Sequence, residues 1–227
     1  MTLVQKEVKA VYKWTVKVRP VQELPFTPWA NTILYAPLTS NANDQSWNWN
    51  NLTADNSFTY SSSGCYMETA NHTWLLTPFN ITSGWTWTIS FWRKWTPYWS
   101  EDQRDIDIYF WSGKRFAWAW FYRQNNTWNC MIGSAWTQNW TLTSNTWQLC
   151  TITIDTNSIK VYLNGGLSFT WTISSGTSSY FRFGNEYNLW ADRHWRGYMK
   201  DIIVENKTWS STEVNDYYES IKSSYGH

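Results

Sequence analysis

Short runs of alternating apolar and polar residues, separated by clusters of Asn, Thr, Ser and Gly, follow one another along most of the chain. A period of two is typical of β-strands that turn one face toward a core. The pattern predicts strands at 32–38, 86–94, 105–110, 114–122, 147–155, 158–165, 180–184 and 197–206. Many short strands with turn residues between them favour an all-β, antiparallel sandwich of two packed sheets.

The alternation also predicts which side chains face the core, although at 147–155 it leaves open which face points inward. The Asn164-Gly165 pair predicts a hairpin turn, because both residues tolerate a positive φ. We expect these side chains to be mostly buried: Phe91, Leu149, Ile152, Ile154, Val161, Leu163, Phe181, Phe183, Ile202 and Val204.

One helix is predicted near the C-terminus. Ser210 and Glu213 have the spacing of a capping box, in which each side chain bonds the backbone of the other residue. An apolar stripe at helical spacing follows, made of Val214, Tyr217, Tyr218 and Ile221. We therefore expect a short helix that lays one face on the sandwich.

Residues 1–25 differ from the rest, since they hold five of the eighteen Lys and Arg residues and lead into prolines at 20, 25 and 28. We interpret 1–25 as a leader or attachment arm and 26–227 as a single domain. The opening residues have no apolar run of the kind that marks a secretory signal.

Composition removes several classes of function. The net charge is +1 and only 15% of residues are charged, whereas nucleic-acid binding depends on a surplus of Lys and Arg. No apolar run approaches the roughly 20 residues of a membrane helix, so we expect no membrane insertion. The three cysteines are an odd number without a C-x-x-C pair, which argues against a disulfide framework or a zinc site.

Several phrases stand in the order and spacing of a known family: WQLCTITID (147–155), SIKVYLNGG (158–166), YFRFGN (180–185) and GYMKDIIVENKTWSSTE (197–213). Together with TISFWRK (88–94) they resemble the laminin-G-like, or concanavalin A-like, jelly roll over roughly residues 29–222. The resemblance implies a two-sheet jelly-roll sandwich closed by a short C-terminal helix, and a lectin-like binding role. The N-terminal KAVYKWTVKVRPV resembles a leader of phage structural proteins, but has Trp14 where that pattern has Gly.

Tryptophan is unusually frequent and glycine scarce, with 21 Trp and 10 Gly in 227 residues. Many Trp stand where turns usually require Gly, so we hypothesise that UGA codons meant as glycine were translated as tryptophan. The alternative is a genuine Trp-rich surface that stacks on sugars. Under the first hypothesis, Trp29, Trp92, Trp147, Trp195 and Trp209 are genuine and more buried than the suspects Trp47, Trp49, Trp85, Trp136, Trp140, Trp171 and Trp190.

Catalytic and metal-binding patterns are sparse. Asp105 and Asp107 lie on one face of a predicted strand, where related glucanases carry E-x-D-x-(x)-E, but the third acid is missing. They are candidate calcium ligands, and they are also what a solvated strand face looks like. Calcium is the one cofactor that the sequence suggests.

Loops at the rim carry ligands in this class of fold, so we predict ligand contacts at Asn185, Tyr187, Asp192 and Arg193. We interpret the protein as a non-catalytic binding or adhesion module for a glycan or another surface ligand, on a virion or an extracellular surface. The alternatives are a purely structural virion protein, with virion proteins or its own copies as partners, and a glycoside hydrolase or lyase.

Overall fold

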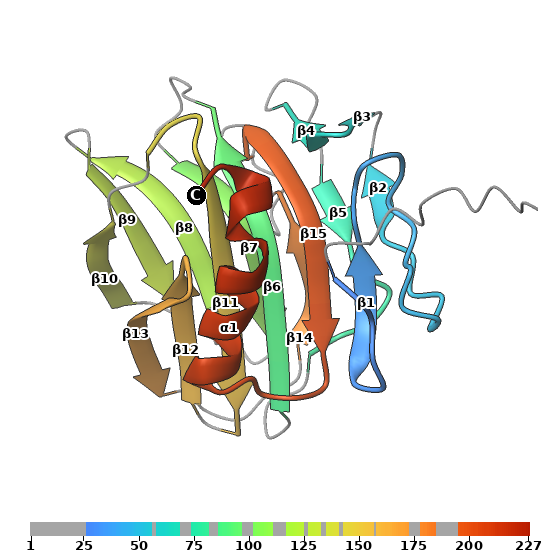
Figure 1. Cartoon of the computed structure of the whole chain (residues 1–227). Coiled ribbons are helices and arrows are strands. Elements are labelled where there is room, and N and C mark those ends of the chain that lie inside the picture. Colours follow the sequence, from blue (N-terminus) through green and yellow to red (C-terminus); the bar gives the residue numbers. More distant parts are fainter. Residues whose placement is uncertain are drawn as a thin grey trace, which may run out of the picture.

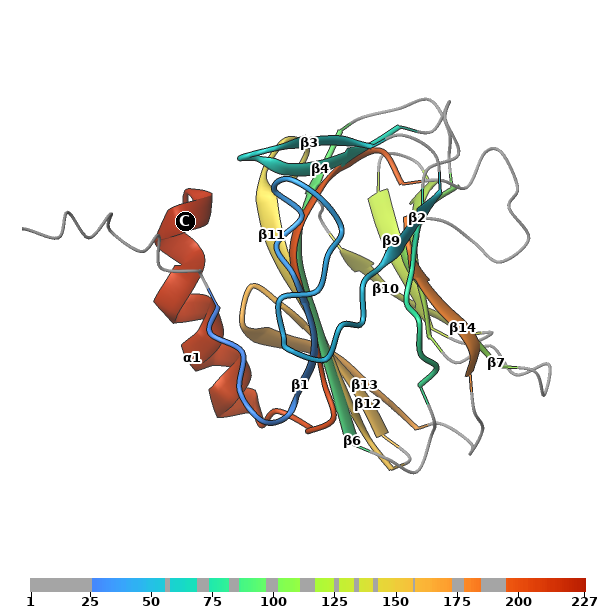
Figure 2. The same ribbon diagram turned by 90° about the vertical axis from the view of Figure 1, so that its right-hand side faces the viewer.

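The structure is a computed structural model that describes residues 26–55, 58–68, 74–81, 86–96, 102–110, 117–124, 127–132, 135–140, 143–156, 158–172, 178–184 and 195–227. Within these residues the chain forms two antiparallel sheets packed face to face, with one helix outside them (Figures 1 and 2). The predicted all-β sandwich with a short C-terminal helix is confirmed. The proposed arm, 1–25, lies outside the described residues.

The sheet nearer the helix has eight strands. They are β1 (Thr32–Ala36), β3 (Thr59–Ser61), β4 (Gly64–Met67), β6 (Thr86–Trp95), β11 (Trp147–Asp155), β12 (Ser158–Leu163), β13 (Gly166–Thr172) and β15 (Gly197–Glu205). Their order is β13-β12-β11-β6-β15-β4-β3, and β1 also pairs with β15. At its centre β6 and β11 pair over their full described register, from Thr86↔Asp155 to Lys94↔Trp147.

The second sheet has seven strands and forms the layer farther from the helix, on the right in Figure 2. They are β2 (Thr53–Asp55), β5 (Trp74–Leu76), β7 (Asp102–Phe110), β8 (Ala117–Gln124), β9 (Thr127–Ile132), β10 (Ala135–Trp140) and β14 (Ser178–Phe183). Their order is β10-β9-β8-β7-β14-β5-β2. Strand β14 returns late in the chain to pair with β7, which gives the sandwich long-range connections between its halves.

The main core lies between the sheets, and the predicted strand phases are confirmed. Nine of the ten expected core residues are buried, and Leu163 is partly buried against the core. In β11, Cys150 and Ile152 face the sandwich, whereas Leu149 packs beneath the helix. Both faces of this strand are therefore covered, which is why its alternation alone did not show an inward side.

Helix α1 (Ser211–Ile221) and the 3-10 turn η2 (Lys222–Tyr225) cover the outer face of the eight-stranded sheet (Figure 1). The capping box between Ser210 and Glu213 is formed as predicted. The turn seals the end of the layer, because the Tyr225 ring stacks on Trp92 with centroids 3.8 Å apart and planes 5° apart.

Several tryptophans that the sequence suggested were in loops lie in strands instead. Trp136 and Trp140 belong to β10, and Trp171 belongs to β13. Trp87 and Trp95 lie in β6 and are 5% and 7% exposed in the main core. The loop interpretation was wrong at these positions because ladder pairing with a neighbouring strand, rather than local composition, decides strand formation there.

The predicted burial contrast holds in part. Trp92 and Trp195 are 0% exposed and Trp209 is 3% exposed, against 85% for Trp47. Trp29, expected to be buried, is 52% exposed: it precedes β1, and its ring lies beside those of Phe26 and Trp209. Trp49 is likewise 84% exposed. The side chains of the other five suspects, Trp85, Trp136, Trp140, Trp171 and Trp190, lie outside the described residues.

Candidate functional site

The four predicted ligand contacts, Asn185, Tyr187, Asp192 and Arg193, lie outside the described residues, but both flanks of their segment are described. Gly184 N donates to Asp105 O at 2.9 Å, and Trp195 N donates to Gly184 O at 2.9 Å. Gly184 and Trp195, which flank segment 185–194, are therefore adjacent to each other and to Asp105 of β7. The ligand contacts stay a prediction.

Asp105 lies beside Gly184, between the two sheets. It is 0% exposed and forms an ion pair with Arg93 of β6. Burial raises the pKa of Asp105 to about 6, although the Arg93 guanidinium acts in the opposite direction. A solvated strand face is therefore the wrong interpretation of Asp105, because the ion pair places its carboxylate inside the core.

Calcium binding at Asp105 and Asp107 stays a prediction, because the Asp107 side chain lies outside the described residues. Among the residues that the structure describes, no group of three or more His, Cys, Asp or Glu side chains could hold a metal ion.

Two further acids are buried under the helix layer. Asp201 accepts hydrogen bonds from the hydroxyls of Tyr35, at 3.1 Å, and Tyr225. Glu205 accepts from Thr32 Oγ1 at 3.1 Å and from Trp209 Nε1 at 2.5 Å. Burial raises the pKa of both carboxyls. These acids tie β1, β15 and the C-terminal segment together, which is a structural role.

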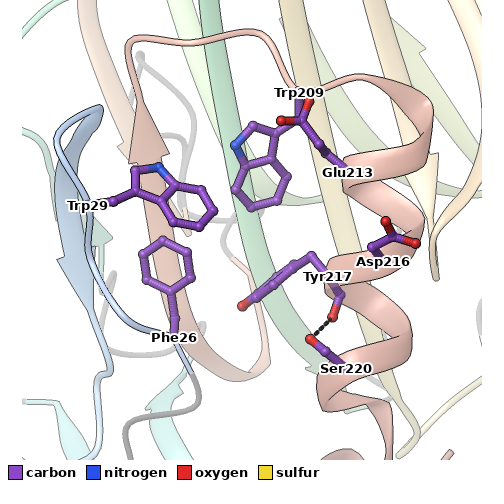
Figure 3. A pocket seen from close by; sticks show the side chains of 7 residues that line it. All are labelled: Phe26, Trp29, Trp209, Glu213, Asp216, Tyr217 and Ser220. Atoms are coloured by element: carbon purple, nitrogen blue, oxygen red, sulfur yellow. Dashed lines mark hydrogen bonds between the residues drawn. The ribbon is translucent and has the colours of Figure 1, made fainter.

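An aromatic hollow of about 320 Å³ lies between α1 and the segment that precedes β1 (Figure 3). Four rings form a circuit around it, each 5.3 to 6.4 Å from the next by centroid: Phe26, Trp29, Trp209 and Tyr217. Glu213, Asp216 and Ser220 complete the lining from the helix. We refer to this site as the aromatic hollow.

The rings of the aromatic hollow differ in exposure. Phe26 and Trp209 are 5% and 3% exposed, so they form its floor, whereas the half-exposed Trp29 forms an open wall. Trp209 is held in place by its hydrogen bond to Glu205. The result is a rigid apolar base beside an indole that water still reaches.

Polar groups at the aromatic hollow are only partly engaged. Glu213 is occupied, because it pairs with Lys207 and accepts from Ser210 N at 2.8 Å, and these contacts lower its pKa. Asp216 is exposed and has no hydrogen bond or ion pair among the described contacts. The Tyr217 hydroxyl is buried without a partner in the described structure, a state that usually costs about 1–3 kcal/mol.

Sequence reasoning placed Trp209 and Tyr217 near the helix but did not bring them together with Phe26 and Trp29. The only available signal was that Trp209 immediately precedes the predicted N-cap Ser210 and that Tyr217 lies on the apolar helical stripe. The approach of Phe26 depends on how the chain enters β1, and local pattern does not encode that path.

Comparison with known proteins supports the fold. A family model described as the concanavalin A-like lectin/glucanases superfamily matches residues 61–215. The chain belongs to this superfamily. No curated protein matches the sequence.

Solved structures share the fold at low sequence identity. Domain 4 of the extracellular GH43 arabinanase AbnA from Geobacillus stearothermophilus, solved with arabinotriose, is 15% identical with a TM-score of 0.61; the match covers 83% of this chain and 98% of that domain. The binding domain of Paraclostridial Mosquitocidal Protein 1 is 14% identical with a TM-score of 0.59, over 84% of this chain and 52% of that one. A Trypanosoma rangeli sialidase reaches a TM-score of 0.72 at 11% identity, over 86% of this chain and 33% of that one.

The chain thus spans about half of the toxin domain and a third of the sialidase. At these identities the likeness concerns the fold alone. In the described part of the chain, no helix has the length and apolar character needed to cross a membrane.

Proposed function

We propose that this protein is a non-catalytic glycan-binding module. The observation that carries the proposal is the aromatic hollow, where the half-exposed Trp29 stands over a rigid aromatic floor and beside the uncommitted Asp216 carboxylate. Sugars present apolar C–H faces that stack on aromatic rings, and hydroxyls that bond to carboxylates. The aromatic hollow supplies both kinds of group in one place.

The superfamily adds support, since it takes its name from lectins as well as glucanases. A domain of similar fold and nearly equal extent was solved with arabinotriose. Neutral glycans of that kind are therefore reasonable first probes for this chain.

The state of the buried acids favours binding over hydrolysis. A glycosidase needs two carboxyl groups flanking the scissile bond, about 5–9.5 Å apart. In the described structure, Asp105, Asp201 and Glu205 are each committed to partners inside the fold. None of these three is free to protonate or attack a substrate.

The rim segment with Asn185, Tyr187, Asp192 and Arg193 remains part of the proposal as a separate contact region. We also propose a place on a virion or another extracellular surface, on the strength of the phage-like phrase at 9–21. Mass spectrometry of purified particles from the source, or genes for tail or capsid proteins beside its gene, would test that placement.

A glycan array probed with the purified chain, followed by titration calorimetry, tests the function. We expect a bound glycan whose affinity falls about tenfold or more in Trp29→Ala, equal to about 1.4 kcal/mol. Trp47→Ala is the matched control, because it removes an indole that is 85% exposed elsewhere on the molecule. No bound glycan would favour a structural virion protein instead.

Two further variants separate the contact regions. Loss of binding in Tyr187→Ala and Asp192→Ala, with Trp29→Ala unaffected, would place the ligand at the rim. Hydrolysis of β-glucans by the wild type that disappears in Asp107→Asn would contradict the non-catalytic proposal.

A further inference from the structure

A second hollow of about 340 Å³ adjoins the aromatic hollow at the start of α1. We refer to it as the polar hollow. It is lined by Thr153, Asp155, Ser158, Lys160, Thr208, Trp209, Ser210 and Glu213. These side chains come from the outer face of β11 and β12 and from the residues that lead into the helix. All but Trp209 are polar or charged, whereas aromatic rings dominate the aromatic hollow.

The two hollows share a wall. Trp209 and Glu213 line both of them, so one hollow ends where the other begins. The wall is rigid, because both nitrogens of Trp209 are hydrogen-bonded. The backbone N donates to Thr88 Oγ1 at 2.8 Å, and the indole Nε1 donates to Glu205. Glu213 is held by Lys207 and Ser210.

Each hollow alone is at the lower end of the usual volume for a small-molecule site, about 300–1,000 Å³. Joined across Trp209, they fall well inside that range. The polar hollow contains Lys160 and Asp155, which are both exposed and lie on the paired strands β12 and β11. Lys160 provides a hydrogen-bond donor and Asp155 an acceptor. This pairing of opposite charges favours hydroxyl groups over a ligand with a net charge.

We propose that the two hollows form one groove for a neutral, unbranched oligosaccharide of at least two units. One unit stacks on Trp29 in the aromatic hollow, and the next crosses Trp209 to meet Asp155 and Lys160 in the polar hollow. The inference rests on the proposed function, and it adds a second subsite and a minimum ligand length.

Titration calorimetry of the full chain with arabinose, arabinobiose and arabinotriose, and with glucose, cellobiose and cellotriose, tests the groove. In at least one series the disaccharide should bind about tenfold or more tightly than the monosaccharide. Lys160→Ala and Asp155→Ala should each reduce that ratio to about threefold or less. Trp29→Ala should weaken both ligands.

Glu219→Ala is the control for a charge removed from an exposed position of α1 outside both hollows. Equal affinity for mono- and disaccharide, or an unchanged ratio in Lys160→Ala and Asp155→Ala, would overturn the groove while leaving glycan binding intact. Failure of the wild type to bind any sugar of either series, or of the array, would instead contradict the proposed function itself.

Discussion

Trp47 and Trp49 have a backbone conformation that does not suit their large side chains. Their φ angles are +74° and +58°, and their indoles are 85% and 84% exposed. The turn around them is held by Asp44, whose carboxylate accepts from Ser46 N and Asn50 N at 2.8 Å each. The left-handed region costs an L-residue about 1–2 kcal/mol, and burial returns nothing here. The positive φ angles and the exposed indoles are what UGA codons meant as glycine would produce if they were translated as tryptophan.

We therefore predict that Trp47→Gly and Trp49→Gly stabilise the fold. Relief of backbone strain should exceed the extra chain entropy of glycine and raise the free energy of unfolding by about 1 kcal/mol each. Urea unfolding measures this. Trp29→Gly is the matched control, since Trp29 is exposed without a positive φ and should lose stability.

The codons give an independent check on the same hypothesis. UGA at positions 47 and 49, with glycine at both in a peptide mass spectrum of the protein from its source, is the expected result. UGG codons there, or lower stability of the two glycine variants, would instead support a genuine exposed tryptophan pair.

The raised pKa of Asp105 predicts a pH dependence of stability. The pKa of its carboxyl is near the ordinary value of 3.8 in the unfolded chain and about 6 in the folded one. Between these values the folded state binds more protons, so the contribution of Asp105 to the free energy of unfolding falls as pH rises, by on the order of 2–3 kcal/mol.

Urea unfolding at pH 4.5 and pH 7 checks this expectation with the wild type and Asp105→Asn. Asp201 and Glu205 have pKa values shifted in the same direction, so the wild-type difference contains all three groups. The variant should show a smaller drop in stability between the two pH values. An equal drop in both proteins would show that Asp105 does not titrate in this range.

At the scale of elements, the strands with clear alternation could be predicted closely. The run at 147–155 coincides with β11, and that at 197–206 differs from β15 by one residue. Strand β10 could not be found, because Gln138 interrupts the alternation between Trp136 and Trp140 and the strand forms by pairing with β9. Likewise, the second buried face of β11 follows from the helix above it, which the strand's own residues do not encode.

The N-terminus of α1 provides a prediction about an element. Ser210 Oγ accepts from Glu213 N at 3.2 Å, and Ser210→Ala should lower the free energy of unfolding by about 1 kcal/mol. Thr212→Ala is the control, since Thr212 is exposed within the same turn and does not cap it. Unfolding curves of the two variants that coincide would contradict a stabilising role for the cap.

At the scale of the whole molecule, three layers determine where a ligand can bind. The helix layer lies on one side of the eight-stranded sheet and the seven-stranded sheet on the other (Figure 2). The sequence predicted the sandwich and the helix, but it placed the expected ligand contacts in a loop at the rim. The aromatic hollow arises where the entry to β1 meets α1, from Phe26 and Tyr217, which are far apart in the chain and whose rings lie 5.9 Å apart.

The most direct test of the central claim is a titration followed through the indole N–H signals of ¹⁵N-labelled protein. The probe is arabinotriose, or the best glycan from the array if arabinotriose does not bind. We predict that the Trp29 signal, assigned by its loss in Trp29→Ala, shifts on binding, while the signals of Trp47 and Trp49 stay in place. A bound glycan that shifts Trp47 or Trp49 and leaves Trp29 unmoved would contradict glycan binding at the aromatic hollow.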